Sequence, residues 1–404
     1  MFQEKTRTKE INNSKKNSWL TRSILGIGLT SLFSDMGHEM ATAILPMFII
    51  TIGGTAATLG LIEGIADASS SFVKLWIGYY SDRIEKRKPI AVIGYVITAI
   101  KGLFAFTTSW YQVLIIRAAA WMGRGARGPV RDAMMADMLE PATYGRAFGF
   151  HTAMDTLGAV LGPAIALALV GVLSFRQIFL ISFIPGLASV GCFAFLVKEK
   201  RKKPDGQAGF WKNLKGLPLN FKLFVFSAGT FGLGNFAHTL LILRATQILT
   251  PEYGKTAAVS MAIGLYTLHN VLYAGFAYPA GILSEKLGKR TLLGAGYLLF
   301  ALMCLGFILE PPKLWAMAIL FILAGIYVAL VDSMERALAG ELLPENLRGT
   351  GYGFLATVNG IGDFVSSFAV GLLWSRISPA AGFAYSGILT FIGAVLLFMI
   401  RNRK

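Results

Sequence analysis

The sequence predicts an all-α membrane protein with twelve transmembrane helices in two pseudo-symmetric six-helix bundles. Three observations lead to this prediction. Among the 404 residues, 54% are hydrophobic and only 15% are charged, whereas soluble domains carry about 25% charged residues. The apolar residues form long runs that recur along the chain and reach the roughly 20 residues that a bilayer-spanning helix needs. The third observation is an internal repeat at half the chain length.

The apolar runs give the predicted helices in chain order, and several are long enough to imply tilt or extension past the bilayer. The predicted spans are 22–51, 56–82, 89–108, 111–138, 145–173, 177–197, 221–249, 256–284, 290–309, 313–340, 350–374 and 379–400. Most connections are short. The one long polar connection, at 198–220, is expected to link an N-terminal bundle at 22–197 to a C-terminal bundle at 221–400, with tails at 1–21 and 401–404.

The positive charges are distributed unevenly around these spans. The net charge is +16, from 38 Lys+Arg and 22 Asp+Glu. When residues at the ends of spans are counted with the adjoining tail or connection, 26 of the 38 lie in the two tails or follow even-numbered spans, 4 follow odd-numbered spans and 8 lie inside spans. Because cytoplasmic loops carry the excess of Lys and Arg, we expect a multi-pass protein of the plasma (bacterial inner) membrane with both termini cytoplasmic. Most of these cations then face anionic lipid headgroups, so nucleic-acid binding loses its support.

The two halves of the chain repeat each other. Gly78-Tyr-Tyr-Ser-Asp82-Arg83 ends the second span, and Gly281-Ile-Leu-Ser-Glu285-Lys286 ends the eighth. The segment from 137 to 158 pairs with that from 341 to 362, which matches Asp with Glu at the first position and Gly with Gly at the last. A parallel repeat of two six-helix halves, with a binding site between them, is typical of secondary transporters.

The repeated segment resembles the signature of the major facilitator superfamily, and the resemblance covers the whole chain. Gly78-x3-Asp82-Arg83-x2-Lys86-Arg87 is similar to the family's GxxxDRxGRR, with Glu85 at the position of the second glycine. Arg117-x5-Gly123-x-Gly125 is similar to the family's RxxxGxG with a looser spacing. The resemblance implies a transporter that alternates access to a central cavity between its two bundles.

The resemblance also implies a gate at the cytoplasmic ends of the helices. Asp82, with Lys86 or Arg87 and an acid at the end of the fourth span, is expected to latch the outward-open state. The candidate gate residues of the two halves are Gly78, Asp82, Arg83, Lys86, Arg87, Arg131, Asp132, Asp137, Gly281, Glu285, Lys289 and Arg290.

The fifth span carries small residues at regular steps. Gly149-x8-Gly158-x3-Gly162-Pro163 resembles the signature of the antiporter branch, without its closing Gly-Gly. This resemblance favours antiport or export over uptake. The nine-residue glycine step recurs at Gly353 and Gly362 in the eleventh span, so these residues are also candidates for close helix packing alone.

Ionisable side chains inside the spans are the main functional signal, because each costs on the order of 2.5–3.5 kcal/mol to insert. Asp35, His38 and Glu39 share one face of the first span, since they are three and four residues apart. An acid in a partly dry site is suited to carrying a proton, and the candidate proton-coupling residues are Asp35, Glu39, Asp67 and Asp155.

The resemblance implies that spans 1, 4, 7 and 10 line the cavity, where the acids of span 1 face the arginines of span 4. Arginine suits bidentate capture of carboxylate or phosphate. The candidate substrate-binding residues are Arg117, Arg124, Arg127, His38, Glu63, His151, Asn235, His238, Arg244, His269, Asn270, Asp332, Arg336 and Asp363. The alternative is a structural salt-bridge network that holds spans 1, 2 and 4 together.

These residues predict a proton-coupled transporter of a small anion-bearing or zwitterionic solute, with export or antiport favoured and uptake symport as an alternative. Export of a divalent transition metal such as iron, through Asp35, His38 and Glu39, is a second alternative. Four nearby arginines would repel such a cation, and neither Cys192 nor Cys304 is spaced to help.

Other functional classes find less support in the sequence. No enzyme motif such as HExxH or a phosphate-binding loop is present, so we expect no catalytic residue and no cofactor beyond a proton gradient. A channel or a receptor remains an alternative function, but the paired gate motifs favour a transporter in which two bundles move against each other. The expected partners are a small-molecule substrate, protons and the lipid bilayer, and the family resemblance implies a monomer.

Overall fold

The computed structural model describes residues 20–81, 86–139, 143–199, 216–344 and 347–400, and no β-strand occurs within these ranges. The helices of the first half are α2 (Arg22–Thr51), α3 (Ala56–Ser81), α4 (Lys88–Ala99) continued by the 3₁₀ helix η1 (Ile100–Phe106), α5 (Trp110–Met138), α6 (Tyr144–Val170) and α7 (Phe175–Leu196). Those of the second half are α9 (Leu219–Gly232), α10 (His238–Tyr253), α11 (Lys255–Leu287), α12 (Lys289–Ile308), α13 (Leu314–Leu342), α14 (Arg348–Arg376) and α15 (Pro379–Met399).

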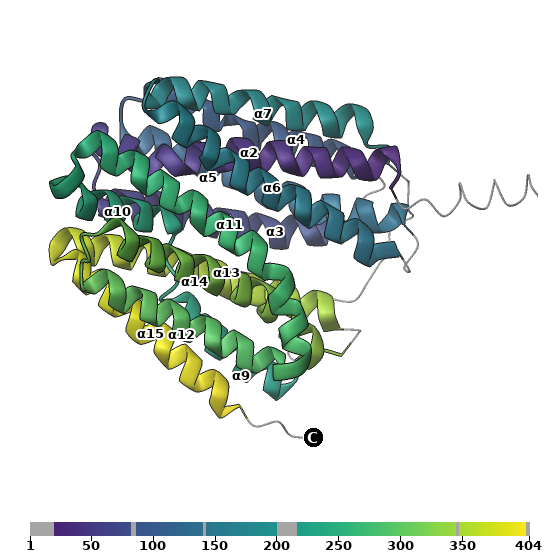
Figure 1. Ribbon diagram of the computed structural model, residues 1–404. Helices are drawn as coiled ribbons and strands as arrows, with labels where there is room; N and C mark the ends of the chain where they lie inside the picture. The colour runs from purple at the N-terminus through teal and green to yellow at the C-terminus, as the bar shows by residue number, and fades with distance from the viewer. Residues whose placement is uncertain (1–19, 82–85, 140–142, 200–215, 345–346, 401–404) are drawn as a thin grey trace, which may run out of the picture.

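The helices of each half pack side by side, and the two groups lie against each other (Figure 1). In this view α2, α4, α5, α6 and α7, coloured purple to teal, lie in the upper part, and α9, α12, α14 and α15 lie in the lower part, while α11, coloured green, runs diagonally from the upper left to the lower right. The groups meet where α3 packs on α14 and α6 packs on α11. Helix α10 adds contacts to α2 and α3. The space enclosed by these contacts between the two halves is where a cavity can form.

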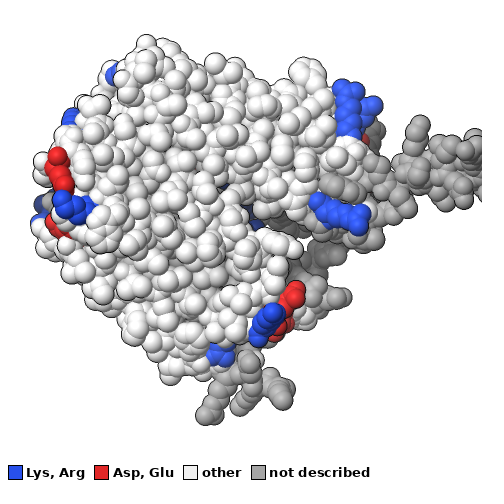
Figure 2. Space-filling model, viewed as in Figure 1, with Lys and Arg blue, Asp and Glu red and all other residues white. Residues whose placement is uncertain are grey.

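Eight helical segments of the described chain are long and apolar enough to cross a membrane. Helices α2, α3 and α5 are not among them because charged and polar residues lower their hydropathy, and α9 and α10 are each short. On the face drawn in Figure 2, charged side chains gather at the two ends of the molecule and leave a broad uncharged belt between them. This distribution is the one that a multi-pass membrane protein needs.

The seventh span differs from the prediction. The sequence predicts one helix over 221–249, whereas the structure has two helices, α9 and α10, separated at 233–237. Two serines of α14 satisfy the backbone at this break: the Ser366 hydroxyl donates to the Asn235 carbonyl oxygen at 2.7 Å, and the Ala237 N–H donates to Ser367 Oγ at 3.0 Å. Broken backbone at membrane depth is tolerated only where protein buries it or where it lines a cavity.

The glycines predicted to pack the fifth span behave in two ways. A Cβ added at Gly158 would lie 2.3 Å from the Leu32 carbonyl oxygen, and one at Gly162 would lie 2.6 Å from that of Met36. Both glycines therefore let α6, which also contains Pro163, lie directly on the α2 backbone. Gly149 differs, because an added Cβ there would meet nothing within 4 Å. Close packing does not explain Gly149.

Replacing Gly158 by alanine is expected to destabilise the protein by about 1–3 kcal/mol, because the new methyl group would displace the α2 backbone. The matched control is Gly149→Ala in the same helix, where the methyl group has room. Thermal unfolding of the purified proteins in detergent measures the difference. Equal unfolding midpoints for the two variants would contradict the close contact between α6 and α2.

Candidate functional site

A cavity of about 580 Å³ lies between the two groups of helices. It is lined from one side by α2, α3, α5 and α6 and from the other by α10, α11, α13 and α14. Among the residues predicted from the sequence, those that line it are Asp35, His38, Glu39, Asp67, Arg124, Arg131, Asp132, His151, Asp155, His238, His269, Asn270, Asp332, Arg336 and Asp363. The structure thus brings fifteen separately predicted residues to one place.

The cavity is closed at one end and open at the other. At the closed end, the α2 residues from Met40 to Ile49 and the α10 residues from Leu240 to Leu243 are buried. At the other end the cavity extends to Arg131, Asp132 and Arg336, close to the ends of α5 and α13. Figure 2 shows a hollow between the two halves on the side where the grey segments lie.

The centre of the site is a carboxylate held between two arginines. Asp35 is 4% exposed, and its carboxylate oxygens lie 3.5 Å from Arg124 Nη2 and 3.8 Å from Arg127 Nη2. Asp155 of α6 reaches the same carboxylate, within hydrogen-bond contact. Two carboxyl groups in such contact can share a proton, because two adjacent carboxylates repel each other. The arrangement can therefore take up and release a proton.

The two arginines that face Asp35 differ in their access to the cavity. The Arg124 side chain is 32% exposed, whereas that of Arg127 is 3% exposed. Arg127 lies with its guanidinium 4.3 Å from the centre of the Tyr95 ring, and it does not line the cavity. Arg124 is thus the arginine of α5 that a solute at this depth can reach.

Arg117 and Glu63, both predicted to bind substrate, lie outside the cavity. Their side chains are 2% and 3% exposed and form an ion pair at 2.9 Å, with two further hydrogen bonds between them at 3.0 and 3.3 Å. The Arg117 guanidinium also lies 3.7 Å from the centre of the Trp121 ring. This pair is satisfied within the protein, so it joins α3 to α5 and leaves no group for a solute.

The face of α2 that was considered for a metal ion has other partners. Lys101 of η1 donates to His38 Nδ1 at 2.5 Å, and His38 Nε2 lies 3.5 Å from Glu39 Oε1. The lysine amine thus occupies His38 Nδ1 and leaves that nitrogen unavailable to a metal ion. Within the described ranges, no group of three or more His, Cys, Asp or Glu side chains is placed to hold a metal ion. The geometry thus gives the metal alternative no support.

Several polar contacts cross the cavity or line its second side. Tyr266 of α11 donates to Glu39 of α2 at 2.7 Å, which joins the two halves. On the side of the second half, Tyr273 donates to Asp332 at 3.1 Å, and His238 Nε2 lies 2.9 Å from the Tyr327 hydroxyl. On the first side, Trp121 donates to Asp67 at 2.7 Å.

Two other predicted substrate-binding residues lie away from the cavity. Asn235 lies in the break between α9 and α10, where its side-chain oxygen accepts a hydrogen bond from Tyr327 at 3.3 Å. Arg244 of α10 pairs with Glu310, and its guanidinium lies 5.8 Å from the Trp374 ring centre. Arg244 therefore stabilises the closed end of the second half. His151 lines the cavity near its mouth, with its Nε2 2.7 Å from Ser31 Oγ.

The predicted gate residues are only partly within the described chain. Asp82 and Arg83 lie outside the described residues, and so do the surroundings of Gly78. Arg87 pairs with Asp137 at 2.7 Å, and Lys289, which the repeat aligns with Lys86, pairs with Glu341 at 2.9 Å. Each half therefore has an ion pair at this end, which links α5 to the start of α4 and α13 to the start of α12, although the two basic residues differ by one position in the repeat.

The remaining gate candidates have individual surroundings. Arg131 pairs with the adjacent Asp132 at 2.9 Å, at the cavity mouth. Arg290 donates to the carbonyl oxygens of Leu397 and Phe398 at the end of α15. Lys86 and Glu285 are exposed. Gly281 has open space around it, so it does not mediate a close helix contact here.

The sequence did not identify some residues of the site. Lys74 lines the cavity and Lys101 contacts His38, and their positions inside spans were the available signal. Trp121, Tyr266 and Tyr273 also line the cavity. Uncharged aromatic residues are common on membrane helices, so no sequence signal set these three apart.

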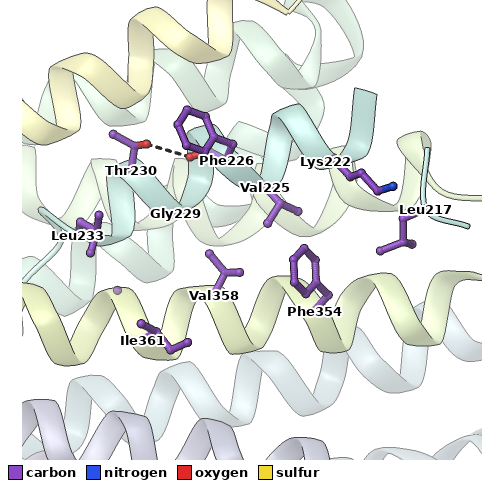
Figure 3. Close-up of a pocket in the computed structure, with 11 residues that line it drawn as sticks. Leu217, Lys222, Val225, Phe226, Gly229, Thr230, Leu233, Phe354, Val358 and Ile361 are labelled. Carbon is purple, nitrogen blue, oxygen red and sulfur yellow. Dashed lines mark hydrogen bonds between the residues drawn. The ribbon is translucent and has the colours of Figure 1, made fainter. Parts of the chain in front are cut away.

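A second cavity of about 540 Å³ lies between α9 and α14 and differs in character (Figure 3). Its lining is apolar except for Lys222 and Thr230, and the Thr230 hydroxyl donates to the Phe226 carbonyl oxygen at 2.9 Å. Phe226 and Ile361, which line it, are 65% and 57% exposed, so it opens on the outer apolar surface. It offers few polar groups to a charged solute.

Comparison with known proteins agrees with this architecture. The sequence matches the model of the Major Facilitator Superfamily over residues 27–264 and 230–404. An uncharacterised MFS-type transporter of Methanocaldococcus jannaschii is 35% identical over 96% of this chain and 97% of its own length. The crystal structure of the POT family transporter PepTSo superposes with a TM-score of 0.78, at 13% identity, over 94% of this chain and 97% of its own.

Two more distant relatives are named by what they transport. A probable 4-methylmuconolactone transporter of Cupriavidus pinatubonensis is 24% identical over 96% of this chain and 90% of its own. A gentisate transporter of Corynebacterium glutamicum is 25% identical over 86% of this chain and 80% of its own. Both are similar to this chain over most of its length.

Proposed function

This chain belongs to the Major Facilitator Superfamily, and on that premise we propose that it carries a small organic anion by proton-coupled alternating access. The observation that carries the proposal is Arg124, which faces the cavity beside the carboxyl pair of Asp35 and Asp155. The family consists of transporters of small solutes with many membrane-spanning helices. The anionic solute and the coupling to protons are the two parts of the proposal that membership of the family does not supply.

An anionic group of the solute would bind Arg124. Its guanidinium is 32% exposed and its ion-pair distance to Asp35 is long, at 3.5 Å. Arginine binds carboxylates through two parallel hydrogen bonds, which Asp35 does not form with it. Gentisate, the named solute of one relative, is an anion of this kind. Lys74 and Arg336 also line the cavity and add to its attraction for anions.

The proton and the anion are coupled because both act on Arg124. When Asp35 is ionised it competes with the solute for this arginine. When Asp35 or Asp155 takes up a proton, the competition weakens and the solute binds. Proton and anion then bind together and move in the same direction, so this geometry favours symport.

Antiport, which the sequence favours, rested on the glycine motif of the fifth span. The direct contacts of Gly158 and Gly162 with the α2 backbone account for two of those glycines by packing. Export therefore stays a prediction without structural support of its own. We place both termini and the open end of the cavity in the cytoplasm, because the excess of Lys and Arg lies on that side.

Transport by purified protein in proteoliposomes tests this function. With gentisate supplied outside at a lower pH than inside, accumulation by symport of one proton is expected to reach about tenfold per pH unit. Protein-free liposomes are the control, because the neutral form of a weak acid crosses bilayers unaided and approaches the same final ratio, so initial rates of uptake are compared. An initial rate no greater than in these liposomes, for gentisate and for a panel of other small organic acids, would overturn the proposal.

A further inference from the structure

The break in the seventh span leaves a set of hydrogen-bond donors at the cavity that the contacts described so far do not use. Helix α10 begins at His238, which lines the cavity. Its N-cap residue is Ala237, and no side chain caps the helix. The first N–H groups of a helix have no partner within it, and they carry the positive end of the helix dipole. The Leu240 N–H donates to the Ala237 carbonyl oxygen at 3.0 Å, which leaves the N–H groups of His238 and Thr239 for an acceptor, and of these two residues His238 lines the cavity.

Two side chains beside this helix start also lack partners. His269 Nδ1 and Asn270 Nδ2 make no hydrogen bond within the described part of the chain, although the two residues are only 2% and 5% exposed. Both line the cavity, and the His269 ring lies 4.8 Å from that of His238. The Asn270 side chain also interacts with the Tyr266 hydroxyl, although its Nδ2 forms no hydrogen bond of ordinary geometry there. Buried polar groups without partners are costly, so a ligand that satisfies them gains affinity.

The surroundings hold these groups in place. Ser366 and Ser367 of α14 bind the backbone on either side of the break. Tyr327 of α13 contacts both His238, at 2.9 Å, and the Asn235 side chain, at 3.3 Å. A site whose donors are fixed before the ligand arrives binds it more tightly, because less freedom is lost on binding.

From these observations we infer a second subsite, formed by the N-terminus of α10, His269 and Asn270, that binds an oxygen of the solute other than its anionic group. This inference rests on the proposed function, in which Arg124 of the other half binds the anion. Asp332 and Asp363 line the same side of the cavity and oppose a second negative charge. The second oxygen is therefore a neutral hydroxyl or carbonyl, and the substrate class is a hydroxy or oxo acid.

A solute of this class would contact both halves of the protein at once. The two subsites face the same cavity, and Tyr266, whose ring stacks on His269 with 5.5 Å between centres, already donates to Glu39 on the opposite side. A bridging solute can thus favour the state in which the halves close around it. A plain acid without the second oxygen would bind Arg124 alone.

Binding of matched acids to the purified full-length protein tests the subsite. The probes are benzoate with 3-hydroxybenzoate, and propionate with lactate and pyruvate, measured by calorimetry in detergent. In the wild type, at least one hydroxy or oxo acid is expected to bind about tenfold more tightly than its plain counterpart. Asn270→Leu and His269→Phe, the second of which keeps the ring stacking, are expected to reduce this ratio to about one.

Two further variants separate the possible outcomes. Arg124→Gln should weaken both members of each pair, and Ser386→Ala, which removes an unpartnered buried hydroxyl outside the cavity, should leave the ratio unchanged. If no acid binds, the proposed function and the subsite both fail. If acids bind through Arg124 with no preference in the wild type, or if both subsite variants keep the preference, the subsite is overturned and the proposed function stands.

Discussion

Replacing Asp35 by asparagine is expected to reduce transport driven by a pH gradient to the level of protein-free liposomes. Asparagine has the shape of a protonated aspartic acid but cannot release a proton, so Arg124 would stay available to the solute at every pH. Exchange of labelled for unlabelled gentisate, without a gradient, should therefore persist in this variant. The measurement compares the two modes of transport in the same proteoliposomes.

The stability of this variant needs its own control, because Asp35 is also the carboxylate beside Arg127, which is 3% exposed. Loss of one partner of a buried ion pair costs about 3–5 kcal/mol. Glu63→Gln breaks a buried pair of the same kind, with Arg117, outside the cavity. It should lower the unfolding temperature, while the protein that remains folded keeps its response to the gradient.

The carboxyl pair of Asp35 and Asp155 separates these two residues from Glu39 among the acids predicted to couple protons. Asp155→Asn should also weaken the response to pH, since Asp155 reaches the Asp35 carboxylate. Glu39 lies apart from this pair and accepts a hydrogen bond from Tyr266 across the cavity. A pH-gradient dependence that is unchanged in both Asp35→Asn and Asp155→Asn would remove the coupling role from the pair.

Much of the fold was predictable because the bilayer imposes a simple rule on the sequence. A helix must be apolar over the thickness of the membrane. Long runs of apolar residues therefore indicate the spans, and charged residues indicate where the spans end. The break between α9 and α10 escaped this rule, because the run there stays apolar. The segment Gly232-Leu-Gly-Asn235 was the available sign, but the serines that stabilise the break belong to α14, far away in the sequence.

The candidate site was predictable in its composition but not in its pairing. Arg117 and Arg124 are seven residues apart in the fourth span, a spacing that puts both on one face of a helix. In the structure the first is buried against Glu63 and the second faces the cavity. The periodicity of a helix gives the direction of a side chain, whereas the neighbouring helices decide what it meets. Lys101 and Tyr266 show the same limit, because their partners His38 and Glu39 lie on another helix.

Replacing Arg124 by glutamine is expected to weaken binding of an organic anion about a hundredfold or more, which corresponds to roughly 3 kcal/mol. The guanidinium is the cation beside Asp35 that is substantially open to the cavity, at 32% exposure, and a charge-assisted bidentate contact is not replaced by an amide. Arg124→Lys keeps the charge but loses the fork of donors, so it should show an intermediate loss. Calorimetry with gentisate measures all three proteins.

The comparison with Arg117 makes this prediction specific to the cavity. Arg117→Gln removes the same charge from the same helix, but it leaves Glu63 buried without its partner, so it should lower the unfolding temperature. Affinity, measured on the protein that remains folded, should change little. Equal losses of affinity in Arg117→Gln and Arg124→Gln would instead show that the arginines act as one structural network. In that case the anion would bind elsewhere in the cavity, with Lys74 and Arg336 as the remaining exposed cations that line it.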